Sequence, residues 1–330
     1  MSGSTSPSKY PYLVSVIIPI YNVSEYIESS LQSALNQTFA SIEYVLVDDR
    51  GTDNSMEIVN AIISIHKRKN DIKVIQHDNN KGLSAARNTG MKHAQGKYLF
   101  FLDSDDEISI DCIQKHYDAI VRIDADFTVA NIELIGSKSI HSNNHLSKDI
   151  ESCPPFVSFC NKRWSVSAWN KLYNKYFIQK SSMEFIDGII HEDVIWSFTL
   201  SRLAKKIAVV NEQTYKYKIR DNSITTKSNS KRKIECLLYI LDEIHSQYSA
   251  DQKNHVYQSE FVKFYDFWRF TTAIQLLIFH GKDDETLGYY HKIQSLNTFK
   301  DFSLYNITLL LPFMLFKSIL KPLYSLYKGL

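Results

Sequence analysis

Short runs of apolar residues, each long enough for one strand, constrain the fold more than any other feature of this sequence. The segment VSVIIPI (14–20) carries no charge, as expected of a strand that helices cover on both faces. Between such runs, apolar residues recur at helical spacing, for example in the segment that follows Ser24. The further expected strands are 42–49, 72–76, 97–103 and 126–135, and the further expected helices are 53–66, 84–94 and 109–122. This alternation predicts an α/β fold with a doubly wound, mostly parallel sheet flanked by helices.

Polar residues follow directly after three of these predicted strands. Tyr21 and Asn22 follow the first, Asp48 and Asp49 end the second, and the acidic residues 103–106 follow the fourth. In open α/β sheets, ligands bind beyond the carboxyl ends of the strands. The placement therefore predicts one pocket of nucleotide size at that edge.

The rest of the chain has a different character. Residues 137–165 are polar and loop-like, and the sequence after 234 is helical in pattern and rich in Tyr and Phe. We expect a flexible segment at 1–11 without the pattern of a signal peptide. The apolar stretch ITLLLPFMLF (307–316) is interrupted by Pro312 and is too short to cross a bilayer, which takes about 18 residues or more.

The acidic cluster in YLFFLDSDD raises two alternatives. Magnesium and similar cations bind carboxylate oxygens together with substrate phosphates, so Asp103 and Asp105 could share one ion. The simpler alternative is that Asp105 or Asp106 caps the helix expected near 109. Taken alone, the cluster favours the cap.

Four motifs in order change that balance. The sequence resembles the family 2 glycosyltransferases with the GT-A fold, of the bacterial surface-polysaccharide type. The resemblance spans roughly residues 12–226, and Arg50-Gly51-Thr52 departs from it, since Gly-Ser-Thr is more usual there. The motifs are VSVIIPIYN, VDDRGTDNS, NNKGLSAARNTGMKHAQGKYLFFLDSDD and HEDVIW.

The resemblance implies a catalytic domain over 12–226, with a nucleotide-sugar half (about 12–135) and an acceptor half (about 136–226). A helical region over 227–330 follows. On the donor side, the family's pattern places Pro19 and Tyr21 beside the uracil or ribose of a UDP-sugar. Asp49 would accept a hydrogen bond from the base, Arg87 would meet the diphosphate, and Lys81 is a weaker candidate. The plain alternatives are strand-end packing for Tyr21, a loop cap for Asp48 and a solvated helix surface for Arg87.

The same resemblance assigns the chemistry to acids. Asp105 would bind Mn²⁺ or Mg²⁺ directly, while Asp103 would reach the ribose or metal-bound water. In HEDVIW, Asp193 would be the general base and Glu192 would orient the acceptor or the base. Considered alone, Glu192-Asp193 is simply a favourable helix N-terminus.

Two further segments resemble acceptor and lid elements of the family. In SAWNKLYNKYFI, Trp169 would stack on a sugar and Lys171 would contact phosphate or hydroxyl groups, although Trp169 as a core residue is as good an interpretation. In YKYKIRDNSIT, Arg220 and Ser223 would contact the nucleotide as a flexible segment closes.

The net charge is only +2, and a value so near neutral argues against a nucleic-acid partner. The charge is nevertheless unevenly distributed along the chain. Residues 202–233 contain ten Lys or Arg but only Glu212 and Asp221. Together with a Lys-interrupted apolar tail, this favours docking on the anionic cytoplasmic face of the inner membrane. A solvated face, or packing of the tail on the catalytic domain or on a twin subunit in a homodimer, is the alternative.

The four motifs and the resemblance that they carry predict an inverting, metal-dependent transferase. It would move a sugar from a UDP-sugar to a hydroxyl of a glycan acceptor. The resemblance implies a lipid-linked acceptor and a role in capsule, O-antigen or related synthesis. A nucleotidyltransferase would need a glycine-rich phosphate loop, and PIYNVSEY has no glycine. A dinucleotide-dependent dehydrogenase would need GxGxxG there. A non-catalytic membrane-peripheral scaffold is the other alternative, and the acids at both ends of the proposed site argue against it.

Overall fold

The computed structural model describes residues 10–136, 146, 148–219, 231–277, 283–296 and 304–320. It divides the chain into two compact units. The first is Met1–Ser158 with Arg163–Arg220, and the second is Phe159–Lys162 with Asp221–Leu330. Each unit has its own core and is described by itself.

The first half of the large sheet is parallel, as the apolar runs predicted. Its strands lie in the order β3-β2-β1-β4, and every residue of β1 and β2 is buried. The strands are β1 (Val14–Ile20), β2 (Ile42–Asp48), β3 (Ile72–Gln76) and β4 (Tyr98–Phe101). In this register Ile20 pairs with Asp48, so the loops that follow β1 and β2 leave the sheet side by side.

The second half of the sheet is mixed and contains three strands that the sequence patterns did not predict. β7 (Leu172–Asn174) runs antiparallel between β4 and β6 (Phe127–Ile135), and β8 (Ile207–Lys218) is parallel to β6. β5 (Glu107–Ile108) closes the eight-strand order as an antiparallel partner of β8. Because β8 lies in the sheet, the residues just after β4 lie close to residues more than 100 positions later.

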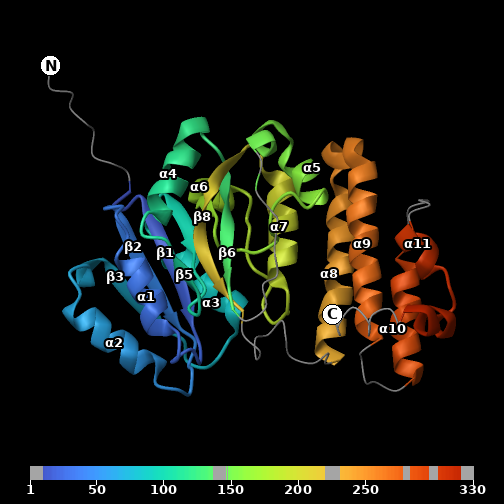
Figure 1. Cartoon of the computed structure of the whole chain (residues 1–330), viewed down its shortest axis with the longest axis horizontal. Coiled ribbons are helices and arrows are strands. Elements are labelled where there is room, and N and C mark those ends of the chain that lie inside the picture. Colours follow the sequence, from blue (N-terminus) through green and yellow to red (C-terminus); the bar gives the residue numbers. More distant parts are fainter. Residues whose placement is uncertain are drawn as a thin grey trace. The chain divides into compact units, whose positions relative to one another are not determined.

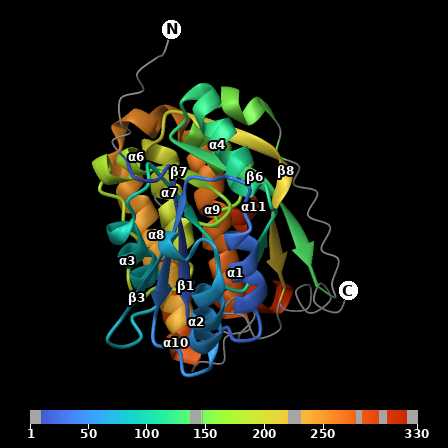
Figure 2. The ribbon, with the colours of Figure 1, turned by 90° about the vertical axis from the view of Figure 1, so that its left-hand side faces the viewer.

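Helices cover both faces of this sheet. Val16 and Ile18 of β1 share a buried cluster with Ile27 and Leu31 of one helix, whereas Ile17 faces Gly90 of another. Figure 2 shows these two helices, α1 and α3, on opposite sides of β1. The helices with bounds inside this unit are α1 (Ile27–Leu35), α2 (Ser55–Ile65), α3 (Leu83–His93), α4 (Cys112–Ile123), α6 (Lys175–Lys180) and α7 (Glu192–Leu203).

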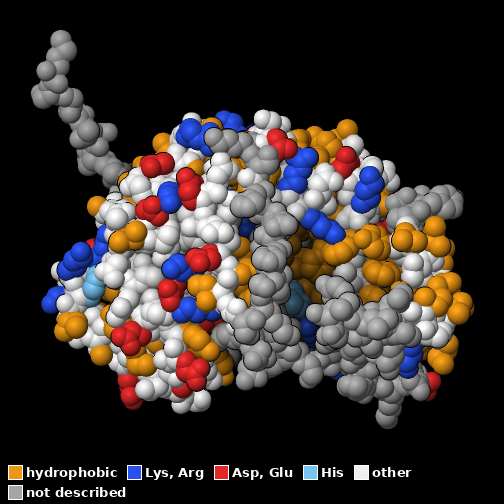
Figure 3. Space-filling model, viewed as in Figure 1, with side chains coloured by type: hydrophobic (Ala, Val, Ile, Leu, Met, Phe, Trp, Pro, Cys, Tyr) orange, Lys and Arg blue, Asp and Glu red, His pale blue; other side chains and the backbone are white. Residues whose placement is uncertain are grey.

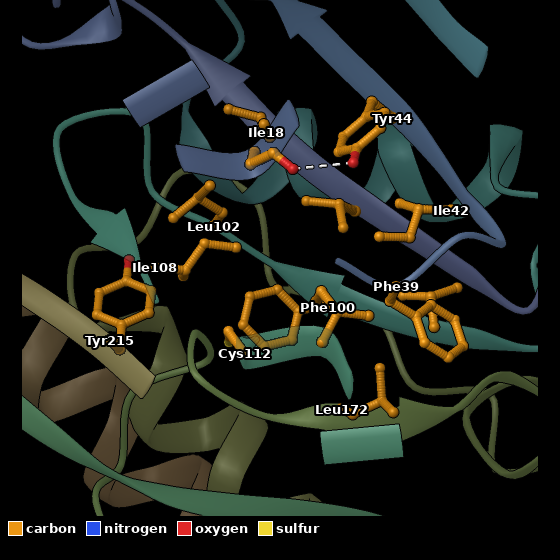
Figure 4. Packing of buried hydrophobic residues seen from close by; sticks show 14 of the residues in the cluster. Ile18, Phe39, Ile42, Tyr44, Phe100, Leu102, Ile108, Cys112, Leu172 and Tyr215 are labelled. Atoms are coloured by element: carbon orange, nitrogen blue, oxygen red, sulfur yellow. Dashed lines mark hydrogen bonds between the residues drawn. The ribbon is translucent and has the colours of Figure 1, made fainter. Parts of the chain in front are cut away.

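One apolar cluster joins the two halves of the sheet. Ile18, Phe100 and Leu172, from β1, β4 and β7, belong to it together with Tyr215 of β8 (Figure 4). Tyr44 lies in the same cluster, and its hydroxyl group donates to the carbonyl of Ala34, 2.8 Å away. The buried polar end is therefore satisfied, and the core fixes the strand edge that carries the acids.

The second unit is helical. It contains a buried ion pair between Arg269 and Asp266 (2.9 Å), and Arg269 also donates to the carbonyl of Ile293. Its elements are α8 (Lys231–Ala250), a 3-10 turn (Gln252–Tyr257), α9 (Gln258–Leu276), α10 (Asp283–Ser295), α11 (Leu304–Leu309) and a helical stretch over 313–320 (Figure 1). A short helix, α5 (Pro155–Cys160), spans the boundary between the units. Among the described helices, none combines the length and apolar character that a membrane span requires.

Candidate active site

Three carboxylates converge directly after β4. Ligand atoms of Asp103, Asp105 and Asp106 all lie within 4.8 Å of one another. Asp106 is buried and accepts hydrogen bonds from the hydroxyl group of Tyr215 and the backbone N–H of Lys218, each at 2.9 Å. Burial, and then the charge of Asp103, raises the pKa of Asp106 to about 7. Asp106 therefore anchors β8, while Asp103 and Asp105 are the more exposed members.

The cluster is not a helix cap. The next helix, α4, begins at Cys112 with Asp111 as its N-cap residue. The alternative interpretation of Asp105 or Asp106 as the cap is therefore wrong. The repulsion between the Asp103 and Asp106 carboxylates, which adds to the effect of burial on Asp106, would be relieved by a divalent cation. Carboxylate oxygens are the ligands that such ions prefer. The chemistry of this set fits Mn²⁺ or Mg²⁺, with Asp105 and Asp103 as the residues that would hold it.

Arg87 of α3 connects this cluster to the second acidic motif. Its Nη2 lies 2.8 Å from Oδ1 of Asp103, and its Nη1 lies 2.6 Å from Oε1 of Glu192, 105 residues away in sequence. Burial disfavours the charge of Arg87, but Asp103 and Glu192 outweigh it and hold its pKa above the ordinary value. Its buried Nε has no hydrogen-bond partner among the described residues. Arg87 is thus a buried bridge between acids rather than a solvated surface residue.

Glu192 and Asp193 form the first turn of α7. The preceding residue, His191, has a left-handed backbone with φ of 69°, which turns the chain sharply into the helix. Burial and the charge of Glu192 raise the pKa of Asp193, and Arg87 acts in the opposite direction. A carboxylate with a raised pKa is a better proton acceptor than an ordinary one. The arrangement suits Asp193 to general base catalysis.

Two residues that the sequence patterns did not single out hold the segment before α7. The side chain of Asn88 donates from Nδ2 to the carbonyl of Phe185 (2.8 Å) and accepts from its N–H (2.9 Å). The ring of Phe185 stacks on Trp196 of α7, with centroids 4.1 Å apart, and lies under the guanidinium of Arg87. The available signal was the position of Asn88 next to Arg87 in SAARNTG, but its partner lies 97 residues further on.

Asp49 is almost fully buried at the entrance to α3. Its Oδ1 lies 2.7 Å from Nδ1 of His77 and accepts from the N–H of Lys81, and its Oδ2 accepts from the N–H of Gly82. Nε2 of His77 lies 2.9 Å from the hydroxyl oxygen of Thr89 on α3. Asp49 thus shapes the loop that contains Lys81 and connects it to α3.

The neighbouring loops hold the other residues expected on the donor side. Pro19 is buried within β1, whereas Tyr21, the first residue after that strand, is 45% exposed. Asn22 has a left-handed backbone, and its Oδ1 accepts from the N–H of Thr52. A Cβ at Gly51 would lie 2.9 Å from the nitrogen of Asn22, so the two loops interlock closely.

Asp48 acts as a loop cap in this structure. Its Oδ1 accepts from the N–H of Arg50 and its Oδ2 from Nε2 of Gln76. This matches the simple alternative for Asp48, and both of its oxygens are used within the protein.

Trp169 and Lys171, expected on the acceptor side, are both engaged by protein. The ring of Trp169 stacks on Tyr215 (4.4 Å between centroids) and on Tyr217 (5.4 Å). Lys171 is buried, and its Nζ donates to the carbonyl of Ser165 at 3.0 Å. Burial lowers the pKa of Lys171 to about 7, and the charge of Asp193 opposes that shift. Lys171 is therefore electrostatically linked to the acid pair.

Arg220 and Ser223 lie outside the described residues. The same segment is described up to residue 219, and its residues 215–218 belong to β8. Of the predicted site residues, the structure brings together five: Asp103, Asp105, Arg87, Glu192 and Asp193. Asp49 is connected to α3, the helix of Arg87, through His77 and Thr89.

The family model described as "Glycosyl transferase family 2" matches residues 15–183, about half of the chain. The sequence is similar to Glycosyltransferase GlyA of Streptococcus pneumoniae serotype 4, with 32% identity over 227 residues that cover 64% of this chain and 31% of GlyA. It is 27% identical over 220 residues to the uncharacterized glycosyltransferase YibD of Escherichia coli K12, covering 64% of this chain and 63% of YibD. The chain thus spans about a third of GlyA and just under two thirds of YibD.

Solved structures share this fold. The structure of S. aureus TarS 1-349 in complex with UDP-GlcNAc aligns with a TM-score of 0.68 and 21% identity, covering 86% of this chain and 80% of TarS 1-349. The mannosyltransferase PcManGT from Pyrobaculum calidifontis, in complex with GDP-Man and Mn²⁺, aligns with a TM-score of 0.59 and 13% identity, covering 95% and 88%. The GT-A-like α/β fold that the motifs predicted is confirmed, with a mixed rather than mostly parallel second half of the sheet.

Proposed function

The chain belongs to glycosyl transferase family 2, and we propose that it transfers a sugar from a UDP-sugar to a hydroxyl group of a glycan acceptor, with inversion. The single observation that carries this proposal is the bridge made by Arg87. It joins Asp103, beside the candidate metal ligand Asp105, to Glu192, beside the candidate base Asp193. Acids from two distant motifs thus contact the same buried guanidinium. The candidate metal ligands and the candidate base therefore belong to one site.

The proposed step is a single displacement. The acceptor hydroxyl oxygen forms a bond to the anomeric carbon, the bond from that carbon to the diphosphate oxygen breaks, and UDP leaves. The hydroxyl proton passes to Asp193, whose raised pKa favours its uptake. Attack from the side opposite to the leaving group inverts the anomeric centre.

The leaving diphosphate gathers negative charge at the Asp103–Asp105 end. A bound Mn²⁺ or Mg²⁺ would neutralise part of that charge. The protein's own contribution is to hold the acids: Arg87 keeps Asp103 oriented, and Tyr215 and Lys218 hold Asp106. Asp103 and the neighbouring Asp106 are therefore held before substrate binds, which lowers the reorganisation needed during transfer.

A UDP-sugar is the proposed donor because TarS, which shares the fold, has been solved with UDP-GlcNAc. Pro19, Tyr21 and Asp49 are the proposed nucleoside contacts, since they lie where the loops after β1 and β2 leave the sheet side by side. Arg220 and Ser223 stay predictions for the same nucleotide. Trp169 and Lys171 are proposed to act on the acceptor side, through the shape they give the segment around residues 165–171 rather than through free side chains.

We further propose a lipid-linked acceptor for bacterial surface-polysaccharide synthesis, reached from the cytoplasmic face of the inner membrane. The helical region, over about 227–330, would then hold the catalytic domain, over about 12–226, near its acceptor. Support comes from exposed apolar residues on α11 and on the helical stretch over 313–320, including Leu304 and Met314. Among relatives, one is named poly(ribitol-phosphate) beta-glucosyltransferase, a polymer-directed activity.

Calorimetry with UDP, with and without Mn²⁺, together with turnover of UDP-GlcNAc, UDP-glucose and UDP-galactose, tests the proposal. Asp193→Ala should lower turnover about 10³-fold while UDP affinity changes less than about twofold, because it removes the base and no nucleotide contact. Asp105→Ala should abolish Mn²⁺-dependent UDP binding. Asp118→Ala, an exposed acid on α4, is the control and should behave as wild type.

Other outcomes separate the alternatives. A scaffold would show no metal-dependent UDP binding, and a nucleotidyltransferase would release pyrophosphate instead of UDP. Full turnover by Asp105→Ala or Asp193→Ala would refute the residue assignments.

A further inference from the structure

Two neighbouring residues of α3, Asn88 and Thr89, bond to different parts of the site. We propose that both are positioning residues with separate tasks: Asn88 sets the place of the acid pair Glu192-Asp193, and Thr89 sets the place of Asp49. This inference rests on the proposed function and assigns roles to residues outside the expected motif chemistry.

Asn88 acts through Phe185. Its two hydrogen bonds to the N–H and carbonyl of Phe185 (2.9 and 2.8 Å) engage both backbone groups of one residue, as a neighbouring strand would. Such a two-point bond fixes both the position and the direction of the backbone. A third contact, 3.3 Å from Nδ2 to Oδ1 of Asp187, extends the bond to the next turn of the segment.

From Phe185 the contact continues to the acid pair. Its ring stacks on Trp196 at 4.1 Å with an interplanar angle of 8°, and Trp196 lies three residues after Asp193 on the same helix face. At the other end of the segment, Arg87 binds Glu192. Two consecutive residues of α3 therefore hold segment 186–191 at its ends: Asn88 binds Phe185 and Arg87 binds Glu192. These contacts together determine where α7 begins.

Thr89 acts through His77. The hydroxyl oxygen of Thr89 lies 2.9 Å from Nε2 of His77, and Nδ1 of His77 lies 2.7 Å from Oδ1 of Asp49. When Thr89 donates to Nε2, the proton of His77 resides on Nδ1 and is donated to Asp49. The carboxyl group of Asp49 is then held in one orientation, which is what hydrogen bonding to a base N–H requires.

These two chains of contacts both begin on α3 but have no residue in common. One leads from Asn88 to the group that takes a proton, and the other leads from Thr89 to the group expected at the nucleoside. Substitutions that cut one chain of contacts should therefore affect different kinetic parameters from substitutions that cut the other.

Asn88→Ala and Thr89→Ala test the separation, because Ala is the better helix former at both positions and α3 should persist. Each full-length variant is measured for UDP affinity with Mn²⁺ by calorimetry. It is also measured for kcat, KM and pH dependence with whichever of the three UDP-sugars the wild type turns over. Thr89→Ser keeps the hydroxyl group, and Lys92→Ala changes an exposed residue of the same helix.

We expect Asn88→Ala to lower kcat about tenfold or more and to shift the acidic limb of the pH profile, with UDP affinity within about twofold of wild type. Thr89→Ala should raise the UDP Kd and the donor KM about fivefold, in a larger proportion than any fall in kcat, and Thr89→Ser should restore both. Lys92→Ala should match wild type.

Equal changes in kcat and UDP affinity in both alanine variants would show a general loosening of α3 and overturn the inference. Wild-type behaviour of both would do the same. A wild-type protein that neither binds UDP nor turns over a UDP-sugar would overturn the proposed function, and this inference with it. If the wild type is active but Asn88→Ala does not act mainly on kcat and Thr89→Ala mainly on UDP affinity, the inference alone is overturned.

Discussion

Asp106 shows how a single residue of the acidic cluster connects stability to pH. It is 1% exposed, lies beside Asp103, and has a pKa of about 7 in the folded protein against about 4 in an unfolded chain. Between these values the folded state binds a proton that the unfolded state has released. The contribution of Asp106 to the free energy of unfolding therefore falls as pH rises from about 4 to about 7.

Asp106→Asn should remove that dependence in protein kept free of metal with EDTA. The amide has nearly the same shape, accepts from Lys218 and has no charge to bury, so unfolding in urea should vary less between pH 5 and 8 than for wild type. At pH 8 the variant should be the more stable, by at most about 4 kcal/mol, the equivalent of three pKa units. Asp118→Asn, at an exposed position, supplies the control. A pH dependence of unfolding that is the same in Asp106→Asn as in wild type would contradict the assigned shift.

At the scale of single elements, the loop between β2 and α2 carries an unusual residue. Arg50 has φ of 59°, a left-handed conformation that favours glycine, and it stands where the family more often has Gly. Its Nε donates to the carbonyl of His77 at 2.8 Å. The hydrogen bond offsets the backbone cost, so the local geometry survives the departure from the motif.

Two substitutions separate these contributions. Arg50→Ala keeps the backbone cost and loses the bond, so the free energy of unfolding should fall by about 1 kcal/mol. Arg50→Gly loses the same bond but relieves the left-handed strain, so it should lie within about 0.5 kcal/mol of wild type. The measurement is urea unfolding at one pH. An Arg50→Gly protein as unstable as Arg50→Ala would show that the backbone carries no strain here.

Elements also show which parts of the fold could be predicted. The strands at 14–20 and 42–49 could be predicted because buried parallel strands are mostly apolar. The strand at 72–76 was also predicted, although it lies at the sheet edge and is partly exposed. β8 falls within the basic run 202–233, which favoured a membrane-facing surface, and its end falls within the predicted lid segment 215–225, although Tyr215 is fully buried in the sheet. β7 has only three residues, too few for any periodicity. β7 and β8 pair with β4, β5 and β6 in the second half of the sheet, so its mixed pairing could not be foreseen.

The same reason limits prediction of the site. Asp103 and Asp105 could be identified because they follow a strand at the edge where ligands bind. Asn88 could not, because its role depends on a contact with Phe185, 97 residues away. Arg87 has two carboxylate partners in the structure that the sequence did not reveal, and its contact with the diphosphate stays a prediction. Motifs identify chemical groups, whereas the assembled sheet determines which groups face each other.

At the scale of the whole molecule, the second unit presents apolar side chains that its own core does not cover. Leu310 is 66% and Met314 73% exposed, and Lys317 follows them. Figure 3 shows hydrophobic side chains gathered at the edge where Figure 1 places α11. Basic residues among exposed apolar ones suit an anionic lipid surface, because both the apolar contact and the charge favour binding.

Sedimentation with vesicles of phosphatidylcholine and phosphatidylglycerol tests this surface. The double substitution Leu310→Glu and Met314→Glu should weaken binding about tenfold or more, because it removes two apolar contacts and adds charge of the same sign as the lipid. Ile65→Glu alters an 88% exposed apolar residue of α2 in the first unit and should leave binding intact. Turnover of the UDP-sugar without vesicles should be the same in all three proteins. Equal loss of vesicle binding in Ile65→Glu would show nonspecific adsorption. Unchanged vesicle binding with a dimer lost in light scattering would assign the surface to a second copy of the chain.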